Sequence, residues 1–303
     1  MRKKTLIRTG FILIILFITL ELTLRFVFGF SDSVLFREDK DFEYIPLPQN
    51  RVRFGNKISY NNFSQRNDAI SKGDSVICLG IGDSVFNGGT QIDQDSLAST
   101  KLTAYLTEKY NRKALFANIS APSWGPDNGF AYLKKYGSFG ASKILLVVSS
   151  HDAHDEMTFE PVVNKHPSYP SKQYKLATAE LVDRYIIGRY VRRYFKSDTS
   201  TNNELMIKQS SGDEPLVSAF ANYKAYCDTA GIELTVYLHP EISELRAHEY
   251  NQAGKKIIAF CESNNVRLIK ELDYKFPEDA YLDDIHLSDN GQRYMFDVLK
   301  KIY

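Results

Sequence analysis

Cysteine is scarce in this 303-residue chain, and neither sign of charge is in excess. The three cysteines, Cys78, Cys227 and Cys261, are far apart and show no C-x-x-C spacing. This argues against a disulfide scaffold and against a cysteine-based zinc site, and Cys78 lies in an apolar run typical of a core. Hydrophobic residues make up 43% of the chain and charged residues 25%, which is the composition of a folded protein and not of a disordered one.

The net charge of +1 is unevenly distributed along the chain. The first 30 residues hold five basic and one acidic side chain, which leaves 33 basic and 36 acidic side chains, a net charge of −3, in the remaining 273. A body with this balance lacks the basic surface by which proteins hold a phosphate backbone. We therefore expect no nucleic-acid partner.

Long apolar runs are absent except at the N-terminus. After the basic start M-R-K-K, residues 9–20 carry no charge, and the apolar character continues to Phe30, broken only by Glu21 and Arg25. About 20 residues span a bilayer. This segment is therefore long enough to cross a membrane if Glu21 and Arg25 lie near the outer interface. The basic flank predicts that the rest of the chain is exported across a bacterial cytoplasmic membrane.

Three interpretations of residues 1–30 remain open. Bulky residues follow the apolar run without a small-x-small cleavage site, which favours an uncleaved membrane anchor over a cleaved signal peptide. A buried helix of a cytosolic protein is the third. Residues 31–70 are polar and turn-rich, and we predict an irregular segment there, between the membrane and the core.

From residue 74 onward, short apolar runs alternate with stretches of helical spacing. The runs predict strands at 74–81, 113–119, 142–150, 232–238 and 266–269, and the spacing predicts helices at 94–110, 127–137, 215–230, 247–264 and 288–302. Continuous apolar strands that alternate with helices are typical of a parallel sheet covered on both faces. We therefore predict an α/β domain over residues 71–303, a three-layer α/β/α sandwich with about five parallel strands.

One interval in this pattern is long. Residues 153–214 predict an insertion over the edge of the sheet, and within it the aromatic and basic stretch 181–196 has the composition of a helix. Two placements of that helix remain open. It lies on the membrane surface, or it is buried as part of the insertion.

Polar residues follow the predicted strands, where open α/β sheets bind their ligands. Ser84 comes after the first strand, and Asp283 and His286 come after the fifth. A serine hydroxyl becomes a good nucleophile when a histidine takes its proton, and a carboxylate can orient that histidine. The Asp-x-x-His spacing lets Asp283 reach one ring nitrogen and leaves Nε2 for Ser84. Either piece alone is also explained by a helix cap or a turn, but their joint placement favours a catalytic triad.

The motifs around these residues resemble the SGNH/GDSL hydrolase superfamily, and more narrowly its membrane-anchored bacterial members. GDSV (82–85) matches the nucleophile block, NISAPSWGPDN (118–128) the second, SSHD (149–152) the third, and DDIHLSDNG (283–291) the block with the catalytic histidine. YNNFSQR (60–66) resembles an N-terminal element of anchored members. The resemblance implies an SGNH-hydrolase-like, flavodoxin-like fold.

The resemblance also implies an oxyanion hole with two substitutions. Its donors would be the N–H of Ser84 and an N–H of the second block, where Ser123 stands at the usual glycine position and Gly125 follows. His151 occupies the place of the usual asparagine, so an imidazole N–H would replace an amide. The implied substrate is an acyl ester, most simply an acetyl ester, on an envelope or exported polysaccharide. The sequence leaves hydrolysis and acyl transfer equally open.

Other residues at the same edge are candidates for substrate contact. These are Asp83, Asp152, His239 and Trp124, although Trp124 and His239 are equally consistent with packing.

Two rival functions remain open. A divalent metal held by the H-D-A-H-D run at 151–155, with Asp83, Asp283 and His286, would make the protein a metal-dependent hydrolase. A non-catalytic carbohydrate-binding module of an envelope assembly, with partner proteins there, is the other. The favoured interpretation requires neither a metal nor an organic cofactor.

Overall fold

A computed structural model describes residues 2–71, 73–191 and 215–303 of the chain. Five parallel strands form its central sheet in the order β6-β5-β7-β8-β9. The strands are β5 (Ser75–Gly82), β6 (Ala114–Ser120), β7 (Lys143–Ser149), β8 (Glu233–His239) and β9 (Arg267–Lys270). The predicted α/β fold with a five-stranded parallel sheet is confirmed.

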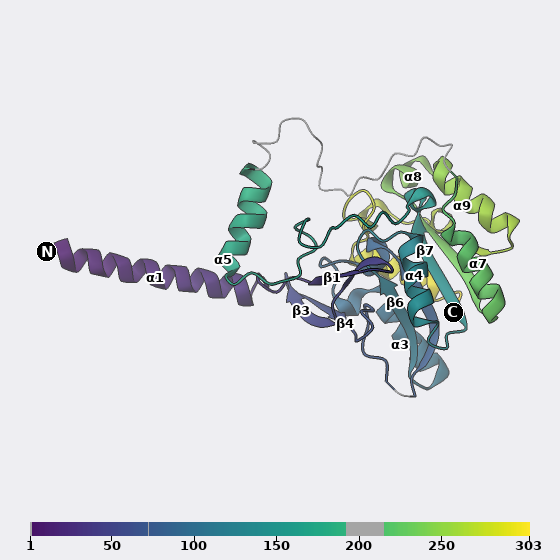
Figure 1. Ribbon diagram of the computed structural model, residues 1–303, viewed down its shortest axis with the longest axis horizontal. Coiled ribbons are helices and arrows are strands. Elements are labelled where there is room, and N and C mark those ends of the chain that lie inside the picture. Colours follow the sequence, from purple (N-terminus) through teal and green to yellow (C-terminus); the bar gives the residue numbers. More distant parts are fainter. Residues whose placement is uncertain (1, 72, 192–214) are drawn as a thin grey trace.

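Helices cover both faces of the sheet, because its strands are apolar on both sides (Figure 1). The helices on one face are α4 (Pro126–Tyr136), α7 (Ala219–Ala230) and α9 (Gln252–Ser263). On the other face lie the short α2 (Ser84–Asn87), α3 (Ala98–Tyr110) and α10 (Asp289–Leu299). Short 3-10 turns complete the domain: η1 (Gln94–Ser96), η2 (Ser150–His154), η4 (Glu271–Tyr274) and η5 (Glu278–Ala280).

The helix predicted at 247–264 is α9, which begins later than predicted, at Gln252, and the preceding short helix α8 (Ile242–Ala247) was not predicted. His248 ends α8 in a left-handed conformation (φ 53°), and the Asn251 side chain caps α9 by accepting a hydrogen bond from the Gly254 N–H at 3.0 Å. An asparagine cap starts a new helix, so residues 248–251 are not helical. The apolar spacing in the sequence continues through these residues and therefore did not show where α9 begins.

The strand order places a crevice between the carboxyl ends of β5 and β7. The chain winds outward in opposite directions from these two strands, so the loops that follow them diverge. The GDSV turn follows β5 and the SSHD turn follows β7. The fold therefore brings the first and third sequence motifs to one place.

The prediction of an irregular segment at 31–70 is wrong. Two antiparallel hairpins occupy it, β1 (Phe36–Asp39) with β2 (Glu43–Pro46), and β3 (Gln49–Arg53) with β4 (Asn56–Tyr60). Their strands have four or five residues and are only partly buried, so the apolar alternation is too short to recognise. Phe42, from the first hairpin, packs on Trp124 with ring centroids 5.6 Å apart, so the segment shares the main core.

Helix α1 (Arg2–Phe26) projects from the body of the molecule (Figure 1). Its residues Lys3–Phe26 have a mean hydropathy of 2.0 and are long and apolar enough to cross a membrane. The C-terminal end of α1 is attached to the folded domain. Glu21 accepts hydrogen bonds from the N–H groups of Ala177 and Thr178 at 2.7 and 2.9 Å, and Arg25 donates to the Lys175 carbonyl at 2.8 Å.

Residues 177–191 of the insertion lie away from the predicted position over the edge of the sheet. Its helix begins as α5 (Ala177–Glu180), continues as π-type turns η3 (Leu181–Val191), and packs beside the end of α1 (Figure 1). Leu24, Phe30, Ala177 and Leu181 form a small apolar cluster there. This placement follows from the apolar residues near the end of α1, which a sequence pattern cannot pair with a distant helix. The remainder of the predicted helix, 192–196, lies outside the described residues.

Candidate active site

Ser84 is the first residue of helix α2, directly after β5. Asp83 caps this turn, because its carboxylate accepts a hydrogen bond from the Val85 N–H at 2.9 Å. Backbone N–H groups in the first turn of a helix have no intrahelical acceptor, so the amide of Ser84 is available by position to a developing negative charge. The serine is half-buried at the crevice.

His286 and Asp283 lie opposite Ser84 on the loop before α10. The Nε2 atom of His286 is 2.9 Å from Ser84 Oγ, and its Nδ1 atom is 2.8 Å from Asp283 Oδ2. The structure therefore brings together, as one hydrogen-bonded line, the three residues predicted as a triad. The geometry is that of a nucleophile, a general base and the carboxylate that orients the base.

A tight local fold holds Asp283 in place. Its Oδ1 atom accepts hydrogen bonds from the backbone N–H groups of Ile285 and His286 at 3.0 and 2.8 Å. Partial burial opposes the charged form, but these bonds and the His286 ring together lower the pKa of Asp283. The carboxylate is thus ionised at neutral pH, as an orienting partner of the base must be.

The triad is open to solvent. The side chains of His286 and Asp283 are 42% and 56% exposed. A reacting ester can therefore approach from the surface and need not enter a buried tunnel.

The second motif supplies a braced backbone beside the triad. Ser123 has a φ of 57°, a conformation that favours glycine, as expected at a position where the resembled family has glycine. Tyr169 donates to Ser123 Oγ at 3.1 Å and Tyr44 donates to the Ser123 carbonyl at 3.1 Å, so tyrosines of two segments hold this turn. The N–H of Gly125 donates to Asn128 Oδ1 at 2.9 Å, which caps α4 and makes Gly125 a poor candidate for the oxyanion hole.

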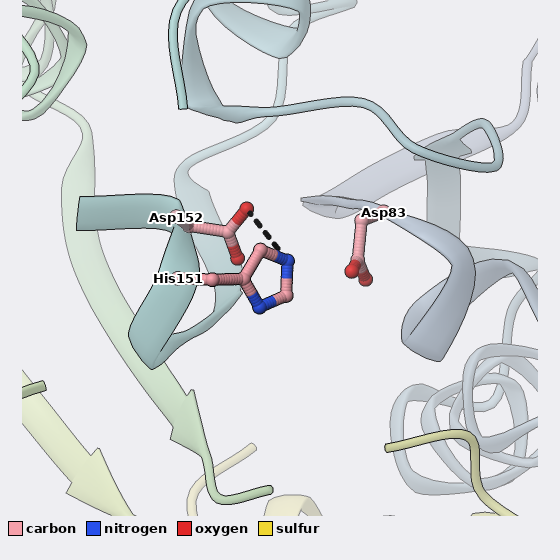
Figure 2. Close-up of side chains that lie close together, drawn as sticks. All are labelled: Asp83, His151 and Asp152. Atoms are coloured by element: carbon pink, nitrogen blue, oxygen red, sulfur yellow. Dashed lines mark ion pairs between the residues drawn. The ribbon is translucent and has the colours of Figure 1, made fainter. Parts of the chain in front are cut away.

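His151 lies in turn η2 among carboxylates from three segments. Its Nε2 atom is 3.7 Å from Asp152 Oδ1 and its Nδ1 atom is 3.6 Å from Glu241 Oε1, and Asp83 lies across the crevice (Figure 2). Burial alone would lower the pKa of His151, but Asp152, Glu241 and Asp83 together raise it to about 10. The surrounding carboxyl groups therefore favour the protonated ring, which carries an N–H on each nitrogen.

Asp152 is almost fully buried beside His151. Its Oδ2 atom accepts from the Ser149 N–H at 2.6 Å, whereas its Oδ1 atom has no hydrogen-bond partner. Burial raises the pKa of Asp152, and the attraction of His151 opposes that rise. The imidazolium offsets part of the cost of burying carboxyl groups at this point.

Asp83, His151 and Asp152 are also the residues that could hold a metal ion. One ligand atom from each lies within 4.8 Å of the others (Figure 2). A protonated imidazole has no lone pair for a metal, so metal binding here would require His151 to lose the proton that the carboxylates stabilise. Asp283 and His286, which the metal interpretation included, belong instead to the hydrogen-bonded line with Ser84.

The four residues predicted to contact substrate are all buried. Trp124 is 2% exposed, and its indole N–H donates to the Tyr44 carbonyl at 2.9 Å, so it packs and does not present a sugar-binding surface. Asp83 and Asp152, with Trp124 and Gly125, line a cavity of about 10 Å³. That volume holds about one water molecule, so a sugar does not fit there.

His239 is a structural brace and not a substrate contact as predicted. It is fully buried, with Nδ1 2.7 Å from Glu271 Oε2 and Nε2 2.8 Å from the carbonyl oxygen of Ile285. The Ile285 carbonyl belongs to the loop that carries Asp283 and His286. The ring of His239 thus joins the end of β8 to the catalytic loop.

Sequence reasoning missed several residues that hold the site. Glu241 is part of the charged surroundings of His151, and its only signal is its position two residues after the end of β8. Gln292, fully buried in α10, donates to the Val85 carbonyl at 2.9 Å and accepts from the Ala98 N–H at 3.0 Å. This glutamine ties the helix after His286 to the helix that begins at Ser84.

The N-terminal element at 60–66 also supports the nucleophile loop. Arg66 is fully buried and donates hydrogen bonds to the carbonyl groups of Gly89 and Ile92, just past α2. Its guanidinium lies 5.5 Å from the ring centroid of Tyr60. The element recognised in the sequence is therefore part of the scaffold around Ser84.

Comparisons with known proteins give weak similarities. No family model matches the chain, and no curated protein matches it. Among solved structures, a member of the lipolytic protein G-D-S-L family from Veillonella parvula DSM 2008 is similar at 9% identity and a TM-score of 0.40, over 76% of this chain and 98% of that one. A mutant acetyl-xylooligosaccharide esterase from Geobacillus Stearmophilus is similar at 10% identity and a TM-score of 0.45, over 77% and 94%.

A lipase/acylhydrolase from Enterococcus faecalis is similar at 11% identity and a TM-score of 0.42, over 75% of this chain and 94% of that one. The function proposed below rests on the side-chain geometry of the triad.

Proposed function

We propose that this protein is a serine acyl-ester hydrolase or O-acyltransferase that acts on acyl groups, most simply acetyl, of a cell-envelope or exported polysaccharide. The observation that carries the proposal is the hydrogen-bonded line from Asp283 through His286 to Ser84. Its residues come from loops 202 positions apart in sequence, and each faces the next with the atom that the chemistry requires.

The reaction follows from this geometry. Ser84 Oγ attacks the ester carbonyl carbon while His286 Nε2 takes the hydroxyl proton, and the carbonyl oxygen becomes an oxyanion. The N–H groups of Ser84 and Ser123 and an N–H of the His151 imidazolium stabilise that charge. Collapse breaks the ester bond, and His286 returns the proton to the departing sugar oxygen. Water or a second hydroxyl then attacks the acyl-enzyme in the same way, which completes hydrolysis or transfer.

A polymeric substrate is supported by the exposure of the site. The side chains of His286 and Asp283 are exposed to solvent, and the cavity lined by Asp83 and Asp152 is too small for a sugar. An acyl group that projects from a long glycan can reach Ser84 from outside. The polysaccharide itself is implied by the sequence resemblance.

The proposed location is the outer side of the bacterial cytoplasmic membrane, with α1 as an uncleaved anchor. The apolar helix and its basic N-terminal flank support this orientation. The contacts of Glu21 and Arg25 with the folded domain support retention of the segment, because cleavage of a signal peptide would remove them.

The test is esterase activity of the full-length protein in detergent on an aryl acetate and on O-acetylated polysaccharides. We expect acetate release that Ser84→Ala lowers at least about 10³-fold, since a triad member acts with the others as a unit. Activity that persists with a chelator argues against the metal-dependent hydrolase, and activity lost with the chelator and restored by a metal supports it. Added acceptor glycan that gains acetyl groups would identify a transferase.

One observation favours a second candidate, the non-catalytic carbohydrate-binding module. His151 stands where the resembled family has asparagine, and its neighbours hold it as a charged group in a salt-bridged cluster. That module predicts a folded protein without turnover, whose glycan affinity Ser84→Ala leaves unchanged.

A further inference from the structure

Exposed apolar side chains gather where α1 joins the folded domain. Phe26, Val27 and Phe28, at the end of α1, are 77%, 64% and 46% exposed. The turn of the β3–β4 hairpin adds Val52 and Phe54, at 54% and 45%. The Phe54 N–H donates to the Phe28 carbonyl at 3.0 Å, so the hairpin turn lies directly against the end of α1.

Helix η3 contributes the third part of this surface. Val182, Tyr185, Ile186 and Ile187 are between 37% and 46% exposed, although three of the four are large aliphatic residues. The buried ring of Phe30 links the parts, because its centroid lies 5.4 Å from that of Tyr185 and 6.0 Å from that of Phe54. We call the exposed residues of these three segments the apolar collar.

A buried ionic network fixes the collar rigidly. Arg53 donates to Glu180 Oε1 at 2.6 Å, and Arg184 donates to the same oxygen at 3.0 Å. Glu180 is fully buried and also accepts from the Ser31 N–H at 2.5 Å. The hairpin, the residues just past α1 and the insertion helix therefore keep one relative orientation.

The direction of the insertion helix matches a membrane surface. In Figure 1, α5 and its continuation run across the direction of α1, beginning at the end of α1 that joins the domain. If α1 lies along the membrane normal, a helix that runs across the end of α1 lies parallel to the membrane–water interface. An interfacial helix buries an apolar face about 5–10 Å deep and keeps its polar groups at the headgroups.

We propose that the apolar collar is a second membrane contact, seated in the outer headgroup region of the bilayer that α1 spans. The proposal rests on the anchoring role proposed for α1, and its partner is the lipid surface. Without lipid, three clusters of large apolar side chains from distant segments would face water together, which soluble proteins rarely show outside binding sites. The collar would fix the catalytic domain at one orientation to the membrane, where α1 alone would leave it free to swivel.

The test is the depth of nitroxide labels on full-length protein in vesicles of phosphatidylcholine and phosphatidylglycerol at 3:1. Single labels go on Ile186→Cys and Val52→Cys in two segments of the collar, on Leu16→Cys in α1, and on Glu108→Cys, an exposed position of α3, as the aqueous control. The native cysteines are buried, so unmodified protein serves as the labelling blank. Retained esterase activity, or an unchanged unfolding transition, shows that each labelled variant is folded.

We expect collisions with oxygen to exceed those with a water-soluble nickel complex at positions 16, 52 and 186, and the reverse at position 108. If position 16 is in the bilayer while 52 and 186 resemble 108, the collar proposal is overturned and the anchor stands. If position 16 also resembles 108, the anchor itself is wrong and the collar proposal falls with it. Neither result bears on the triad, which the activity assay tests separately.

Discussion

At the scale of single residues, the site depends on two histidines that do not belong to the triad. His151 lies among carboxyl groups near Ser84, and His239 is a buried brace behind the loop of Asp283 and His286. The two rings differ in their contacts: His151 has only ion pairs, at 3.6 and 3.7 Å, whereas both ring nitrogens of His239 are hydrogen-bonded.

The role of His151 is tested by its removal. Loss of one oxyanion donor costs about 10²–10³ in kcat, so His151→Ala should lower kcat by that factor with little change in KM. His151→Asn keeps a donor and should retain more activity. Equal activity of His151→Ala and the unmodified protein would exclude the ring from the oxyanion hole.

The dependence of kcat on pH should distinguish the unmodified protein from His151→Asn. Because the pKa of His151 is raised to about 10, the ring is charged below that pH and loses its proton as the pH rises through it. We expect kcat of the unmodified protein to fall on the alkaline side near pH 10, and His151→Asn to lack this fall, since an amide does not titrate. The measurement is background-corrected kcat from pH 7 to 11.

His239 is expected to position the catalytic loop. Burial alone would lower its pKa, but Glu271 raises it, so the ring can donate to both Glu271 and the Ile285 carbonyl. Its stabilising effect is therefore complete below the ordinary histidine pKa and is lost as the pH rises through the raised value. His239→Ala leaves a buried carboxylate unpaired and should cost about 3–5 kcal/mol of unfolding free energy, with a fall in kcat.

Urea unfolding and kinetics below 20 °C measure both effects of His239→Ala. Glu271→Gln, which keeps a hydrogen-bond acceptor, is the milder comparison and should retain more of the kcat. A His239→Ala protein as stable and as active as the unmodified one would remove the brace from this account.

At the scale of elements, strands β6, β7 and β8 could be predicted because each is a nearly continuous run of buried residues. The hairpins at 36–60 could not, because their pairing partners are a few residues away and their burial depends on Trp124 and Tyr132, far along the chain. The triad was accessible to sequence reasoning because Asp283 and His286 are neighbours in one loop. The pair His239–Glu271 was not, since its members come from separate elements 32 residues apart.

Gly291 determines how closely α10 packs on the catalytic loop. A Cβ atom there would lie 2.2 Å from the Ala280 carbonyl oxygen and 2.9 Å from Leu287 Cβ. Gly291→Ala must therefore push α10 away from the loop that carries His286, and we expect a loss of about 1–3 kcal/mol in unfolding free energy together with reduced kcat.

The control for Gly291→Ala is Asp297→Ala, an exposed position of the same helix, which should change stability by less than about 0.5 kcal/mol. Thermal and urea unfolding of the purified proteins measure the stability of both variants. If Gly291→Ala behaves like this control, the close approach of α10 to the loop is not a constraint on the site.

At the scale of the whole molecule, an apolar helix projects from an α/β domain (Figure 1). The side chains of His286 and Asp283 at the edge of that domain are exposed to solvent. The sequence predicted both parts, because a long apolar run and a regular strand–helix alternation are each visible locally. It misplaced the insertion, because the position of that segment depends on contacts between Glu21 and the helix that begins at Ala177, 156 residues later. The apolar helix and the Ser84–His286–Asp283 line together support the proposal of a membrane-anchored enzyme that acts on a large substrate.

The most direct test of that proposal is the intact mass of the full-length protein after treatment with a fluorophosphonate, measured beside Ser84→Ala. An activated Ser84 Oγ displaces fluoride from phosphorus and retains the phosphonyl group, so we predict one adduct on the unmodified protein and none on the variant. A folded, monodisperse protein that forms no adduct, or a Ser84→Ala variant that forms the same adduct, would contradict serine catalysis at this site.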